Sequence, residues 1–259
     1  MITQIKGRKH TYEKFKEMDS SGLAGIMALS ASACGSKAGR GTVETKSGSS
    51  KTESTAAASQ GAGDVTAEEK AEKEDENFST GEVSGSTYKQ DFFKIQLTRD
   101  TPWVFSTEEE LQAQNQAIVD ASNDKEVKDA VENGNLYVDM TVANQETGET
   151  TMVRILKVGL GDMLASDSDL AETMKQSLID DLNSTAGVSG GAGTVEDTTF
   201  LGKSVPSAYV KGVLNYGGNE FDVFERCVIV RKGTFVAVVI ATALIDDTTA
   251  DQLAAFTSL

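Results

Sequence analysis

Histidine is nearly absent from this sequence. Its only histidine is His10, and its only cysteines are Cys34 and Cys227. If the N-terminal segment is removed, as argued below, no imidazole remains in the mature chain. Ser-His and Cys-His catalysis and histidine-ligated metal sites are then excluded, because each requires an imidazole. The sequence also carries no catalytic or ligand-binding signature. We expect no catalytic residue, no metal site and no cofactor, and we expect that the protein is not an enzyme.

Positive charge is also scarce. The formal net charge is −16, and residues 1–33 carry five Lys and Arg against three Asp and Glu, so the remainder carries −18. A surface this acidic repels phosphate backbones and anionic headgroups. We expect no nucleic-acid partner.

Apolar runs long enough to span a membrane are missing, and the apolar run near the N-terminus is short. "GLAGIMALSASA" (Gly22–Ala33) follows five Lys and Arg residues between positions 6 and 16. The run is too short to span a bilayer stably, but a positive start, an apolar run and small residues together are typical of a signal peptide. With "ACGSK" after it, the segment resembles a bacterial lipoprotein signal. The resemblance implies that residues 1–33 are removed and that Cys34 is lipidated. The alternative is a disordered N-terminus in which Cys34 is incidental.

Large apolar residues are rare in the segment that follows. Between Gly35 and Ser86 the only ones are Val43, Val65, Phe78 and Val83. Such a segment cannot bury enough surface to offset the entropy of ordering it. We expect residues 34–86 to form a lipidated, disordered linker and residues 87–259 to form one globular domain.

The globular part alternates between strand and helix patterns. Residues 87–98 predict one or two short strands, and 135–144 with 150–159 predict a hairpin in which Leu136, Val138, Met140 and Val142 share one face. Helices are expected at 106–122, capped by Ser106 with Glu109, at 125–134, at 169–183, capped by Asp169, and at 248–259. The last quarter predicts four strands, and the apolar residues 234–245 are expected to form a central one.

This order predicts an α+β fold with an antiparallel sheet flanked by helices. "FKIQLTRDTPWVFSTEEELQAQN" (Phe93–Asn115) and the later "ERCVIVRKGTFVAVVIAT" (Glu225–Thr242) resemble uncharacterised lipoproteins of Gram-positive bacteria. Their layout is similar to the Mog1/PsbP-like α/β/α sandwich. That superfamily is mostly non-enzymatic, so the resemblance implies a binding domain on the outer face of the cytoplasmic membrane.

Several motifs suggest chemistry that their surroundings do not support. Gly202-Lys203-Ser204 lacks the upstream glycine and the following helix of a phosphate-binding loop, so a tight turn is favoured. The glycine-dense residues 187–193 are expected to form a mobile loop. Asp162, Asp167 and Asp169 lack the regular spacing of a calcium loop. Cys227 lies among apolar residues, which favours a buried inert thiol.

Exposed aromatic residues are the remaining candidates for a partner surface. Trp103, Phe105 and Tyr209 are chosen on residue type alone, because aromatic side chains dominate binding hot spots. The favoured interpretation is a lipid-anchored extracytoplasmic module that binds an unknown protein or small molecule. The alternatives are an envelope enzyme that works without histidine and an envelope assembly or chaperone factor.

Overall fold

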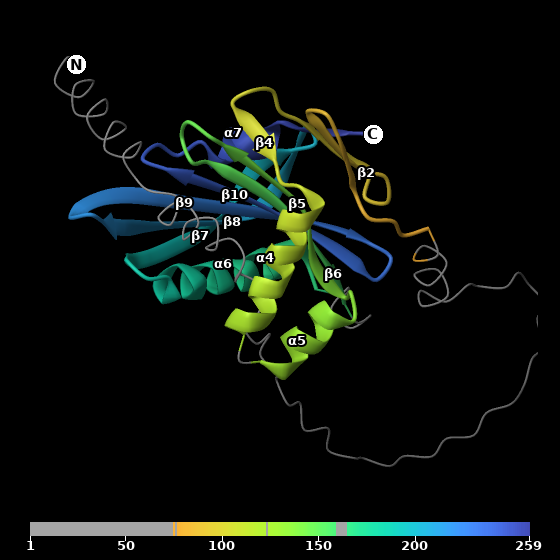
Figure 1. The fold of residues 1–259 in the computed structure, drawn as a ribbon, viewed down its shortest axis with the longest axis horizontal. Helices are drawn as coiled ribbons and strands as arrows, with labels where there is room; N and C mark the ends of the chain where they lie inside the picture. The colour runs from red at the N-terminus through yellow and green to blue at the C-terminus, as the bar shows by residue number, and fades with distance from the viewer. Residues whose placement is uncertain (1–74, 76, 123, 159–164) are drawn as a thin grey trace, which may run out of the picture.

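The computed structural model describes residues 75, 77–122, 124–158 and 165–259. The expected signal segment, Cys34 and most of the expected linker lie outside the described residues. So does Asp162 of the acidic cluster. The described part is an α+β fold in which all strand pairs are antiparallel and strands outnumber helices (Figure 1).

The strands form two sheets. The small sheet has the order β1-β2-β3-β11 and the large sheet the order β4-β5-β6-β10-β9-β8-β7. The small-sheet strands are β1 (Glu82–Ser84), β2 (Thr87–Gln90), β3 (Ile95–Thr98) and β11 (Phe256–Ser258). The large-sheet strands are β4 (Trp103–Phe105), β5 (Leu136–Asn144), β6 (Thr150–Lys157), β7 (Val188–Phe200), β8 (Lys203–Tyr216), β9 (Asn219–Lys232) and β10 (Phe235–Leu244).

Three helices cover one face of the large sheet. They are α4 (Glu108–Ala121), α5 (Lys125–Glu132) and α6 (Asp167–Ser184), which lie along the same side in Figure 1. Leu178 and Leu182 of α6 are fully buried against β8, β9 and β10. Ile118 of α4 packs on Val138 and Met152 of the hairpin. The helices expected at 106–122, 125–134 and 169–183 are thus present, with shifted ends, and lie on this face.

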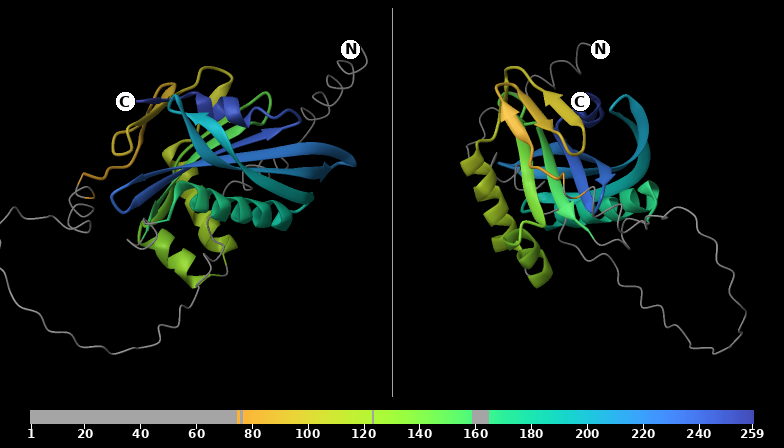
Figure 2. Two further views of the ribbon diagram at one scale, coloured as in Figure 1. Left: turned by 180° about the vertical axis from the view of Figure 1, so that it is seen from behind. Right: turned by 90° about the vertical axis from the view of Figure 1, so that its right-hand side faces the viewer.

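The small sheet covers most of the opposite face, beside the short helix α7 (Thr249–Ala254), as the two views of Figure 2 show. Tyr88, Ile95 and Leu97 of the small sheet meet Val239 of β10 in one core. The expected second helix layer of an α/β/α sandwich is thus largely replaced by a sheet. The reason is that the expected C-terminal helix ends early, and Phe256–Ser258 instead pairs with β3.

The central-strand prediction is confirmed. All ten residues of β10 are buried, and the strand lies between β6 and β9. The turn at Gly202 joins β7 to β8, as expected for Gly202-Lys203-Ser204. The glycine-dense residues were predicted wrongly as a loop, because Val188 onward pairs with β8 across a register shift between Ser189 and Ala192.

The globular part begins earlier than residue 87. Phe78 stacks on Phe235 with ring centroids 3.8 Å apart, and β1 belongs to the small sheet. Residues 78–86 therefore belong to the fold, although their composition indicates a linker. Few apolar residues suffice here, because Phe78 joins a core that the rest of the chain already forms.

Both expected helix caps were misplaced. Thr107, not Ser106, caps α4 and forms a reciprocal capping box with Glu110. Ser166 caps α6, and Asp169 is the third helical residue of its capping box. The hydroxyl of Ser166 and the carboxylate of Asp169 thus satisfy orphan backbone groups at the start of α6, which explains the position of Asp169 without calcium.

Candidate functional site

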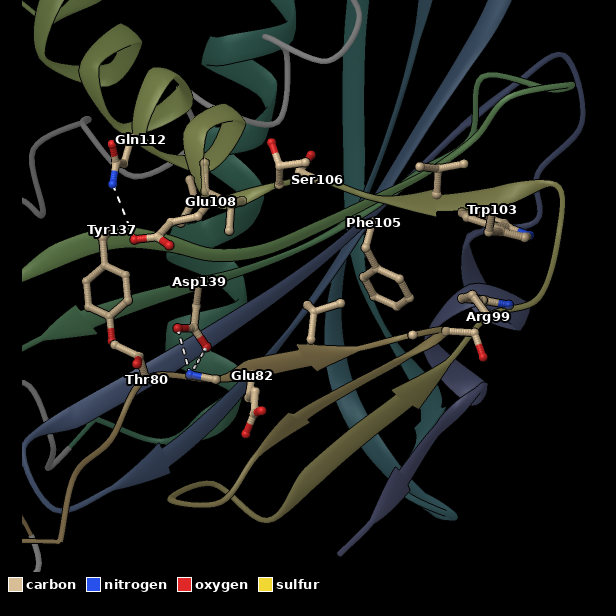
Figure 3. Close-up of a pocket in the computed structure, with 18 of the residues that line it drawn as sticks. Thr80, Glu82, Arg99, Trp103, Phe105, Ser106, Glu108, Gln112, Tyr137 and Asp139 are labelled. Carbon is tan, nitrogen blue, oxygen red and sulfur yellow. Dashed lines mark hydrogen bonds between the residues drawn. The ribbon is translucent and has the colours of Figure 1, made fainter.

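A groove of about 1070 Å³ opens between one free edge of each sheet. β1 borders it from the small sheet, β4 from the large sheet, and the first two turns of α4 form a wall (Figure 3). We call this feature the edge-strand groove. Its lining includes residues 80–83, 85–86, 99–101 and 103–108, with Leu111, Gln112, Asn115, Tyr137, Val138 and Asp139.

β4 presents unpaired backbone groups to the groove. Ser106 N–H donates to the carbonyl of Thr141, and Gln145 N–H donates to the carbonyl of Pro102. Backbone groups of successive strand residues point to opposite edges. The even-numbered residues of β4 therefore pair with β5, so the N–H of Phe105 and the carbonyls of Trp103 and Phe105 face the free edge.

β1 presents a second free edge. Ser84 pairs with Thr87 across a two-residue turn in which Gly85 has a φ of +60°, the conformation that a first turn position of this kind requires. The closing pair of such a hairpin is hydrogen-bonded, so the next residue, Val83, directs its N–H and carbonyl away from β2. No other strand of the described chain pairs with this edge.

The side chains of the groove are apolar near the strand edges. Trp103 and Phe105 are half-buried and pack on the core between the sheets. Val83 is 37% exposed and Val104 is 54% exposed; apart from Leu259, these are the only large hydrophobic residues counted as exposed in the described chain. Exposed valines therefore coincide with unpaired strand edges.

One end of the groove is closed by a buried carboxylate. A β-bulge between Val138 and Met140 interrupts the alternation of β5, so Val138 faces α4 whereas Met140 and Val142 face the small sheet. The expected single face of Leu136, Val138, Met140 and Val142 is wrong for this reason. The bulged residue is Asp139.

Asp139 ties β5 to the start of β1. Its carboxylate accepts hydrogen bonds from Gly81 N–H at 2.9 and 3.0 Å (Figure 3). It also accepts one from the Tyr88 hydroxyl at 2.6 Å. The amide of Gln90 donates to it at 3.3 Å. Burial raises the pKa of Asp139, and these donors oppose that shift. Gly81 has to be glycine here, because a Cβ would lie 2.5 Å from the Asp139 carboxylate.

The other end of the groove is formed by Arg99 and Trp103. The Arg99 guanidinium lies 4.5 Å from the centre of the Trp103 ring and donates to the carbonyl of Gln252 at 3.1 Å. Burial lowers the pKa of Arg99, and the charge of Glu149 opposes this shift. The guanidinium is thus held by an aromatic face and a backbone acceptor.

The groove is negatively charged overall. Glu82, Asp100, Glu108 and Asp139 line it, against the single cation Arg99. Glu82, Asp100 and Glu108 form no salt bridge within the described chain. A ligand with positive charge therefore meets rim carboxylates that are not neutralised.

The structure brings together two of the three predicted partner-surface residues. Trp103 and Phe105 line the groove, whereas Tyr209 of β8 lies outside it, beneath the Arg226 guanidinium at 4.5 Å. Burial, together with the charge of Asp247, raises the pKa of Tyr209 to about 12. Cys227 is buried, as expected.

Sequence reasoning missed Val83, Val104 and Asp139. Valine in a strand pattern carries no sign of whether the strand lies at an edge. Asp139 did carry a signal, because a carboxylate in the middle of "LYVDMTVAN" interrupts an apolar alternation. Such an interruption indicates either a bulge or a functional carboxylate.

A second set of buried charges lies under α6, away from the groove. Arg154 of β6, Asp181 of α6 and Glu225 of β9 are all buried, and Glu225 has no exposed surface. Burial raises the pKa of Asp181 to about 7 and that of Glu225 to about 8, while the cation of Arg154 opposes both shifts. This cluster is closed to solvent, so we assign it to stability rather than to binding.

Comparisons with known proteins add little. No protein-family model matches the chain, and no curated protein matches it. Among solved structures, the chain is similar to LpqN of Mycobacterium tuberculosis, described as involved in cell envelope biogenesis. The two share 15% sequence identity over 63% of this chain and 82% of LpqN, with a TM-score of 0.34. A likeness this slight establishes no family, so function is inferred from the groove.

Proposed function

We propose that this protein is a lipid-anchored binding module on the outer face of the bacterial cytoplasmic membrane, and that the edge-strand groove is its binding site. The observation that carries the proposal is the meeting of two free strand edges around exposed valines and half-buried aromatic rings. Natural proteins normally blunt or cover such edges, because they attract other chains. A groove that leaves two of them open is suited to receive a ligand.

Binding fits the groove better than catalysis does. Asp139 is its most buried carboxylate, and its oxygens already accept four hydrogen bonds from Gly81, Tyr88 and Gln90. A general acid or base needs to exchange its proton with a substrate. Asp139 instead acts as a fixed anchor between β5 and the start of β1.

Binding of one defined ligand also fits better than a chaperone role. A chaperone surface requires a broad apolar patch. The exposed apolar residues of the groove are two valines, and acidic side chains surround them. The surface is therefore narrow and charged.

The proposed lipid anchor is inferred from the sequence around Cys34. Two acyl chains on this cysteine suffice for stable membrane attachment, because each buried methylene contributes about 0.8 kcal/mol. We propose that residues 35–74 form a flexible tether of about 40 residues, whose root-mean-square reach of roughly 35 Å holds the folded part clear of the headgroups. No helix in the described ranges is long and apolar enough to cross a membrane.

A selection experiment tests the groove. Phage displaying random dodecapeptides are selected on the full-length chain, and the binders are measured on two variants. Val104→Lys places a positive charge in the groove without disturbing the core, because Val104 is largely exposed. Leu259→Lys makes the same change at an exposed residue outside the groove.

We expect the selected peptides to bind Leu259→Lys as they bind the wild type and to lose binding to Val104→Lys. Equal binding to both variants, or no enriched peptide at all, would contradict the proposal.

A further inference from the structure

We propose that the groove binds an extended polypeptide segment rich in lysine or arginine, which pairs as an added strand with the free edge of β4. This inference rests on the proposed function and specifies its ligand. It follows from the backbone groups of β4, from the alternation of its side chains and from the charge around them.

The backbone of β4 offers a short hydrogen-bonding template. Ser106 and Pro102 bond to β5, so the free edge carries the N–H of Phe105 and the carbonyls of Trp103 and Phe105. Strand addition satisfies such groups with the main chain of a ligand and leaves specificity to alternate side chains.

Because the side chains of β4 alternate between two sides, the side chains of an added strand must alternate in the same way. Trp103 and Phe105 point to the core side, and Val104 points to the opposite side. In an added strand, every second residue therefore packs beside the two aromatic rings. The intervening residues lie on the side of Val104, near the first turn of α4, where Glu108 is located.

The charges select a basic segment. Glu82, Asp100 and Glu108 form no salt bridge within the described chain, and the one cation of the groove, Arg99, is held against Trp103. A lysine or arginine on the ligand would neutralise a rim carboxylate that nothing else neutralises. A second copy of this chain is disfavoured as the occupant, because it carries a net charge of −16 and the same acidic groove.

Synthetic peptides test the proposal without altering the protein fold. Three capped octapeptides are compared: alternating Lys-Val, alternating Glu-Val, and Lys-Val with every backbone amide N-methylated. The third keeps the charge and the side chains but cannot donate the hydrogen bonds of a strand. Trp103 is the only tryptophan, so the emission of the full-length protein reports directly on the groove.

We expect the Lys-Val peptide to shift the Trp103 emission saturably and the other two to bind at least about ten-fold more weakly, a difference of 1.4 kcal/mol. Raising the salt from 50 to 500 mM should weaken Lys-Val binding several-fold, because exposed charge pairs are screened. Glu108→Gln should weaken it in the same direction, with Glu220→Gln as a control outside the groove.

Four results overturn the inference. Equal binding of the N-methylated peptide rejects strand addition, and equal binding of Glu-Val rejects charge selection. A dimer that sedimentation detects in the wild type and that Val104→Lys dissociates assigns the edge to a second copy. If none of the octapeptides binds but phage-selected peptides still require Val104, this inference fails while the proposed function stands. If the phage selection fails as well, both fail.

Discussion

Asp139 is the residue on which the shape of the groove depends. Asp139→Ala would leave Gly81 N–H and the Tyr88 hydroxyl without an acceptor in a buried place. Since a buried donor that loses its partner costs about 1–3 kcal/mol, we expect a loss of about 3 kcal/mol in the free energy of unfolding, measured in urea.

Asp139→Asn is the matched control, because its amide oxygen still accepts. We expect it to lose about 1 kcal/mol. Equal stability of wild type and Asp139→Ala would show that these hydrogen bonds contribute nothing.

The cluster under α6 makes a prediction about pH. Asp181 and Glu225 share the cation of Arg154, so the folded protein retains a proton near neutral pH that the unfolded chain, with carboxyl pKa values near 4, has released. The folded state then binds more protons than the unfolded state. The free energy of unfolding therefore falls as the pH rises from about 5 to about 8, by at most about 1.4 kcal/mol per pH unit for each of the two carboxyl groups.

Urea titrations between pH 5.5 and 8.5 measure this slope. Glu225→Gln removes one of the two acids and should flatten it, whereas Glu220→Gln, at an exposed position of the same strand, should not. A slope that Glu225→Gln leaves unchanged would disprove the assignment.

At the scale of elements, the start of α4 yields a sharp test. Thr107 accepts a hydrogen bond from Glu110 N–H, and the carboxylate of Glu110 accepts one from Thr107 N–H at 2.7 Å. Thr107→Ala should lower the free energy of unfolding by about 1 kcal/mol. Ser106→Ala should cost clearly less, since Ser106 lies before the cap. The reverse order in thermal or urea unfolding would restore Ser106 as the cap.

Most elements could be predicted from the sequence, whereas their exact ends could not. Ser106 with Glu109 and Thr107 with Glu110 both have the spacing of a capping box. The tertiary fold chooses between them, because Ser106 N–H still pairs with Thr141 and so belongs to the strand side of the junction. The β-bulge at Asp139 likewise depends on pairing with β6.

Only some of the residues that line the groove could be predicted from the sequence. Trp103 and Phe105 were chosen for their aromatic rings, and the structure places both in it. Tyr209 was chosen for the same reason but lies elsewhere, because residue type does not reveal position. Val83 and Val104 could not be found, since the edge status of a strand depends on which distant strands pair beside it.

At the scale of the whole molecule, the anchor remains a prediction with a direct test. In cells grown with radioactive fatty acid, the wild-type protein should become labelled, and the Cys34→Ala variant should not. Cys227→Ala is the matched control, because that thiol is buried in the core and should not accept lipid. Equal labelling of wild type and Cys34→Ala would reject the anchor.

The order of strands has a consequence for how the chain reaches its folded state. β10, which lies at the centre of the large sheet, and β11, which completes the small sheet beside β3, both come from residues 235–258. Neither sheet can close until that stretch has emerged from the ribosome, and pairings so distant in sequence form slowly. We expect a nascent chain with this strand order to complete its two sheets only at the end of its synthesis.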